Sequence, residues 1–209
     1  MTPRTPWSRA VTALGALAVT TLTTNCAGQS TPSPTMADER RADTVTVPAS
    51  TWTPTPIDVL ADMPSAAAQR TPAGAEAYVR YYFDTLNHLS MNPQTGQIIK
   101  LCLPDVMACT APESGFASDL KRGFHMEDAA HQFLDCKGTI VDDNDADTAI
   151  VDAVTIGMPR TVLDDSHSTR AVATSQVRFW SHFTIVWKQN RWFISEHTAE
   201  NAPHSTSSS

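Results

Sequence analysis

The sequence predicts an α+β domain in which two or three N-terminal helices pack on a curved antiparallel sheet of about four strands. Two observations carry this prediction. Apolar residues recur at helical spacing between Thr71 and Leu89, whereas alternating aromatic and β-branched residues dominate after Glu127 and culminate in a long hairpin at 177–197. The domain is expected to span residues 57–198.

The two ends of the chain differ in composition from this domain. Residues 1–26 are typical of a secretory signal peptide, because Arg4 and Arg9 precede an apolar run that is too short to cross a bilayer comfortably. Residues 27–56 are rich in Pro, Thr and Ser and are expected to form a disordered stalk. Residues 199–209 are expected to be a disordered tail.

Cys26 closes the signal peptide and opens the stalk. A cysteine in this place resembles the lipidated cysteine of bacterial lipoproteins, whose thiol is diacylated, for example with palmitate, and becomes the new N-terminus. The resemblance implies an anchor at Cys26 on the extracytoplasmic face of the cell membrane. Asn25 stands where those signals have a small residue, so plain secretion is the alternative.

The charge of the chain limits its partners. It has 15 basic and 22 acidic residues and a net charge of −7; loss of Arg4 and Arg9 with the signal peptide leaves 13 basic residues and a charge of −9. Nothing basic is clustered, so nucleic acid is not an expected partner. Contact with the membrane is expected through the lipid anchor only. No cofactor is expected.

The helices are predicted from their start signals and apolar stripes. Thr71 is a hydroxyl cap and Pro72 fits the first turn, so a helix is expected from there to about Leu89. A shorter helix is expected over 96–101 and a third from Pro112 to about Lys121 or Phe124. The core stripe of the first helix consists of Val79, Tyr82, Phe83, Leu86 and Leu89.

Strands are expected at 133–141 and 148–158, joined by an acidic turn, and a loop at 164–167 leads to the long hairpin. Gln189-Asn190 is predicted to be its two-residue turn. This turn fixes which residues face one another. On the apolar face the expected pairs are Trp187 with Trp192, Ile185 with Ile194 and Phe183 with Glu196, and on the opposite face His182 with His197.

Three segments resemble an uncharacterised family of actinobacterial lipoproteins: Gly74 to Tyr82 (GAEAYVRYY), Leu86-Asn87 and Leu101 to Cys109. The resemblance covers residues 58–109. The domain of that family is similar to the nuclear-transport-factor-2-like fold, also called the polyketide-cyclase-like cone, and Trp192 to Ile194 are similar to its last strand. The resemblance implies a cone-shaped fold and no established activity. The family often has a C-x-x-C pair, but Val106 occupies the first of those positions here and Cys102 stands four residues earlier.

Candidate chemistry centres on the hairpin. In the predicted register Glu196 is a carboxylate among aromatic residues, with Ser181 nearby and Tyr82 reaching in from the helix, so a raised pKa would make it a candidate acid or base. The alternative is a solvated or arginine-paired Glu196 at the rim of the sheet. A disulfide is expected between Cys102 and Cys109, with a Cys109–Cys136 link as the alternative. No metal site is expected, because the cysteine spacing suits no zinc pattern.

Three functions follow from these features. The main hypothesis is a non-catalytic, envelope-anchored domain that binds a small apolar ligand or an envelope protein partner through its cone. The second is an enzyme of the polyketide-cyclase or isomerase type that uses Glu196 as acid or base, since enzymes of the resembled fold transfer protons inside the cone. The third is a purely structural component of the envelope.

Overall fold

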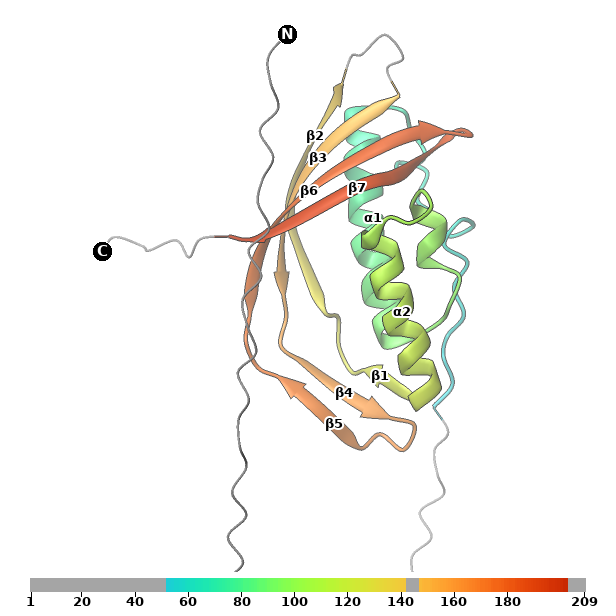
Figure 1. The fold of residues 1–209 in the computed structure, drawn as a ribbon, viewed down its shortest axis with the longest axis vertical. Coiled ribbons are helices and arrows are strands. Elements are labelled where there is room, and N and C mark those ends of the chain that lie inside the picture. The colour runs from blue at the N-terminus through green and yellow to red at the C-terminus, as the bar shows by residue number, and fades with distance from the viewer. Residues whose placement is uncertain (1–51, 142–146, 203–209) are drawn as a thin grey trace, which may run out of the picture. The chain divides into compact units, whose positions relative to one another are not determined.

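The computed structural model describes residues 52–141 and 147–202, all within one compact unit. The expected signal peptide, the expected lipidation site at Cys26, most of the expected stalk and tail and most of the acidic turn lie outside the described residues. The architecture is α+β, as the sequence predicts, with helices packed on antiparallel sheets (Figure 1).

The first helix, α1 (Pro72–Met91), begins as expected. The Thr71 hydroxyl accepts a hydrogen bond from the Gly74 backbone N–H at 3.0 Å, and Pro72 occupies the first turn, where its missing N–H leaves no bond unmade. All five residues of the predicted core stripe are buried. A 3-10 helix, η1 (Ile98–Leu101), lies within the segment where a short helix was expected.

The helix α2 (Met107–Arg122) begins five residues before Pro112, where the sequence predicted its start. Proline inside a helix cannot donate to the carbonyl four residues earlier, which here is Ala108. The Tyr82 hydroxyl of α1 donates to this carbonyl instead, at 2.6 Å. The prediction was wrong because the compensating donor comes from a distant part of the chain.

Seven strands form two antiparallel sheets in the described residues. The larger sheet has the order β2-β3-β6-β7, formed by β2 (His131–Val141), β3 (Thr148–Gly157), β6 (Val177–Lys188) and β7 (Arg191–Asn201). The smaller has the order β1-β4-β5, formed by β1 (Phe124–Met126), β4 (Arg160–Asp164) and β5 (Thr169–Ala173). This second sheet was not expected from the sequence, because β5 is short and almost entirely exposed and so has no alternating apolar face.

Both helices lie on the same side of the larger sheet, α1 against β2 and β3 and α2 against β7 (Figure 1). We call this side the inner face and the other side the open face. Between α1 and the inner face lies an aromatic cluster in which the Phe183 ring makes edge contacts with Tyr82 and Phe83, at centroid distances of 5.7 and 5.8 Å. These rings belong to the hydrophobic core.

The hairpin of β6 and β7 has the predicted turn. Gln189 and Asn190 both have positive φ, at 51° and 60°, as a two-residue turn of this hand requires. Trp187 faces Trp192, as expected, and their rings meet edge to face at 5.1 Å. The Trp192 indole N–H also donates to the Gln69 carbonyl at 2.8 Å, which ties this end of the hairpin to the start of α1.

A β-bulge at Ser195 changes the register over the second half of β7. Glu196 therefore faces Thr184 on the open face, and His197 faces Phe183 on the inner face. The expected pairs Phe183–Glu196 and His182–His197 are both wrong. The bulge replaces a carboxylate, which is costly to bury, with an imidazole that stacks on Phe183 at 4.3 Å.

The ordered domain is longer at both ends than expected. Thr55 lies in the segment predicted to be a disordered stalk, yet its N–H donates to Asn92 at 3.1 Å and its carbonyl accepts from Gln94 at 2.9 Å. Trp52 stacks on His125 with a centroid distance of 4.2 Å. At the other end, β7 continues to Asn201, three residues beyond the predicted boundary at 198.

Candidate functional site

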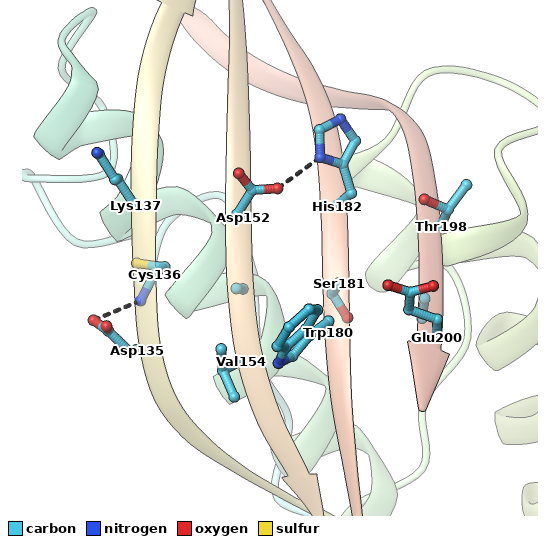
Figure 2. Close-up of a pocket in the computed structure, with 12 residues that line it drawn as sticks. Asp135, Cys136, Lys137, Asp152, Val154, Trp180, Ser181, His182, Thr198 and Glu200 are labelled. Atoms are coloured by element: carbon cyan, nitrogen blue, oxygen red, sulfur yellow. Dashed lines mark hydrogen bonds and ion pairs between the residues drawn. The ribbon is translucent and has the colours of Figure 1, made fainter. Parts of the chain in front are cut away.

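The open face of the larger sheet carries a hollow of about 700 Å³, on the side away from the helices (Figure 2). Two cross-strand rows of side chains define it. The tryptophan row consists of Asp135, Val154, Trp180 and Glu200, one residue from each strand. The histidine row beside it consists of Lys137, Asp152, His182 and Thr198. We call this site the Trp180 hollow.

Trp180 is the largest apolar side chain of the hollow and is 48% exposed. It lies on the open face because it alternates with Ser181, which is buried on the inner face. Within the described residues its indole has no hydrogen bond and no ring contact. Tryptophan is enriched at binding hot spots, so this half-exposed ring is the side chain of the hollow best suited to contact a partner.

The histidine row contains the one hydrogen bond between two side chains of the hollow within the described residues. The Asp152 carboxylate accepts a hydrogen bond from Nδ1 of His182 at 2.6 Å (Figure 2). Because an ionised carboxylate only accepts, Nδ1 carries the proton in the neutral imidazole and Nε2 is left as an acceptor. Asp152 thus fixes the tautomer and the orientation of the ring.

The hollow is acidic. Three carboxylates, from Asp135, Asp152 and Glu200, line it against a single ammonium group, from Lys137. The carboxylate of Glu200 lies directly across the strand pair from Trp180 and has no hydrogen bond or ion pair within the described residues. The site therefore combines an exposed aromatic ring with unneutralised negative charge.

The structure does not bring the three candidate catalytic residues together. Glu196 is exposed on the open face, so its expected place among aromatic residues is wrong. Ser181 is buried between Ala153 and Ala199 on the inner face. The Tyr82 hydroxyl is committed to the Ala108 carbonyl, and burial raises its pKa.

His197 takes the place on the inner face that was expected for Glu196. Its Nε2 is buried and has no hydrogen-bond partner among the described residues, and burial lowers the pKa of the imidazole. The Trp180 hollow lies on the opposite face of the sheet, so His197 does not line it. No pattern in the sequence marks the bulge that turns His197 inward.

The cysteines are arranged as expected. Cys102 and Cys109 form a disulfide that links the end of η1 to the first turn of α2, and a hollow of about 360 Å³ lies beside it. Cys136 is a free, half-buried thiol whose pKa is raised by burial to about 11, which makes it a poor nucleophile.

The described residues contain no group of three or more His, Cys, Asp or Glu side chains placed to hold a metal ion. In the same part of the chain, none of the helices combines the length and the apolar character needed to cross a membrane.

Comparison with known proteins gives a likeness of structure alone. No family model and no curated protein matches the chain. The intermembrane space region of the chloroplast protein ARC6 is similar over 63% of this chain and 98% of its own, with 15% identity and a TM-score of 0.46. A putative calcium/calmodulin dependent protein kinase II association domain from Xanthomonas campestris is similar over 61% and 88%, with 18% identity and a TM-score of 0.39.

The yeast UBP3-associated protein BRE5 is similar over 60% of this chain and 92% of its own, with 7% identity and a TM-score of 0.35. All three TM-scores are below 0.5, so these structures identify neither a family nor a function for the chain.

Proposed function

We propose that the protein is an exported, lipid-anchored, non-catalytic domain that binds a partner at the Trp180 hollow. One observation carries this proposal: a half-exposed tryptophan, whose indole makes no hydrogen bond or ring contact within the described residues, stands in a hollow of about 700 Å³. This volume lies in the range of ligand-binding sites, about 300–1,000 Å³. The signal peptide and Cys26 support presentation at the extracytoplasmic face of the cell membrane.

We also propose that the domain has the cone-shaped nuclear-transport-factor-2-like fold. Helices that precede a curved antiparallel sheet, and a long C-terminal hairpin that closes it, support this assignment. The resemblance of residues 58–109 to the lipoprotein family with that fold supports it further.

We place binding at the open face, rather than inside the cone, because packed side chains fill the space at the inner face. The rings of Tyr82, Phe83 and Phe183 pack between α1 and the sheet, and His197 stacks on Phe183. The open face has no such cover from the helices. An exposed Glu196 also leaves the cyclase-type or isomerase-type hypothesis without its acid or base.

Native mass spectrometry of the chain, taken from membranes of the cells that make it, tests the binding proposal. We expect an additional bound mass on the wild type. We expect the same mass on Leu134→Ser, which changes a different exposed apolar residue, and its loss on Trp180→Ser. A purely structural component would carry no bound mass, and that result would overturn the proposal.

Partitioning into a detergent phase tests the anchor separately. The wild type is expected in the detergent phase with acyl chains on Cys26, and Cys26→Ser in the aqueous phase. A wild-type protein that stays aqueous and unmodified would instead establish a secreted product.

A further inference from the structure

We propose that the Trp180 hollow recognises an arginine side chain in an extended segment of a protein partner. This inference rests on the proposed function, since it names the chemistry of whatever binds at that site. It follows from three properties that the hollow has within the described residues: a free aromatic face, an unpaired carboxylate beside it and an excess of negative charge.

The free aromatic face favours a planar cation. Tryptophan is the best of the aromatic side chains for cation–π contacts, and guanidinium groups are the most frequent cations in them. Arginines cover Phe133, Phe124 and Phe193 within the described domain, at 4.2 to 4.8 Å from the ring centroids. None covers Trp180 in the same part of the chain, although Arg178 is two residues away on the same strand.

The unpaired carboxylate lies where the edge of a stacked guanidinium would be. Glu200 faces Trp180 directly across β6 and β7, and such residues have Cβ atoms about 4.5–5.5 Å apart. A guanidinium can therefore lie on the indole while its N–H groups donate to both oxygens of Glu200. Lysine lacks the plane and the fork of donors that this arrangement uses.

The charge of the hollow decides between kinds of partner. Three carboxylates face one ammonium group, so nucleic acid and anionic lipid are repelled. A second copy of the chain would place the same carboxylates against each other, which disfavours self-association. A basic protein segment is attracted instead.

The size of the hollow favours a protein segment over a free small cation. Each row crosses four strands, or about 14 Å at the usual spacing of 4.7–4.9 Å between strands. A volume of about 700 Å³ exceeds what one side chain fills. Neighbours of the arginine in an extended segment can occupy the remainder, between Val154 and the histidine row.

Titration of the full-length chain in detergent micelles tests the inference, with the indole N–H resonance of Trp180 as the NMR readout. The probe is the peptide acetyl-Gly-Arg-Gly-Arg-Gly-amide, and its controls replace arginine with neutral citrulline or with lysine. We expect the arginine peptide to shift the Trp180 resonance and to bind about tenfold more tightly than the citrulline peptide. The lysine peptide is expected between them.

Variants locate the binding. Glu200→Gln should weaken binding of the arginine peptide about tenfold, and Glu196→Gln, on the same strand and face, should leave it unchanged. Trp180→Leu should weaken binding by a similar factor. Because this variant lacks the indole, its binding is measured from the backbone amide resonances of β6. Glu200→Gln keeps the test valid if the leucine variant fails to fold.

Three results would overturn the inference: equal affinity for the arginine and citrulline peptides, equal effects of Glu196→Gln and Glu200→Gln, or resonance shifts that follow self-association in sedimentation velocity. If the native protein carries a bound mass that depends on Trp180, but the protein does not bind the arginine peptide, this inference fails and the proposed function stands. If it carries no bound mass, the proposed function fails as well.

Discussion

The Tyr82 hydroxyl is predicted to stabilise the fold because Pro112 leaves a helix carbonyl without its usual donor. Tyr82 and Ala108 are 3% and 7% exposed, so water cannot substitute freely for the 2.6 Å bond between them. Tyr82→Phe keeps the ring and removes only this donor. We expect it to lower the free energy of unfolding by about 1–3 kcal/mol, the cost of a buried group left without a partner.

Pro112→Ala supplies the second half of the test. It restores a backbone N–H that can donate to the Ala108 carbonyl in the ordinary helical way. In this background Tyr82→Phe should cost only about 0.5–1 kcal/mol, so the two substitutions should be coupled by about 1 kcal/mol. Denaturant unfolding of the four proteins in the cycle measures this coupling.

Tyr78→Phe is the matched control. The Tyr78 hydroxyl makes a similar buried bond, to the Leu101 carbonyl at 2.7 Å, but this carbonyl does not depend on Pro112. Tyr78→Phe should lower the free energy of unfolding by the same amount with and without Pro112→Ala. The reasoning is refuted if Tyr82→Phe also costs the same in both backgrounds.

Three further predictions concern the disulfide and the hairpin. Replacing Cys102 and Cys109 by Ser should lower the free energy of unfolding by about 2.5 kcal/mol, for a loop with a separation of seven residues; an unchanged denaturation midpoint would contradict this. Glu196→Gln should change the free energy of unfolding by less than about 0.5 kcal/mol, because Glu196 is exposed. A clear gain in melting temperature would instead indicate that Glu196 is buried, as in the register without a bulge. The wild type should lose stability as the pH falls below about 6.5, because burial lowers the pKa of His197 and the unfolded chain then binds more protons than the folded one. His197→Phe should reduce this slope between pH 7.5 and 5.5 in thermal melts without abolishing it, because His125 and His131 have pKa values lowered in the same direction; an unchanged slope would contradict the assignment.

Features encoded over short stretches were predictable from the sequence. The cap at Thr71, the buried stripe of α1 and the turn at Gln189-Asn190 depend on neighbouring residues alone, and the structure has all three. The segment around Pro112 was not predictable in the same way. Its helix persists because of a donor on another helix, and that contact exists only in the folded domain.

The site was harder to predict than the fold, because one bulge reverses the faces of a strand. Alternation assigns residues to faces correctly only while the pairing stays regular. One extra residue at Ser195 places Glu196 on the open face and His197 on the inner face. The inner face therefore carries an imidazole where a carboxylate was expected. Trp180 was not singled out from the sequence, because its exposure on the open face depends on the helices covering only the other side of the sheet.

Carboxylate labelling in intact cells tests most directly whether the Trp180 hollow is a binding surface. A water-soluble carbodiimide and an amine label exposed carboxylates, and fragment masses separate Glu200, in the hollow, from Glu196, outside it on the same strand and face. The account predicts that Glu200 is labelled much less in cells than in the purified protein, whereas Glu196 is labelled equally in both. Equal labelling of Glu200 in the two samples would contradict the account.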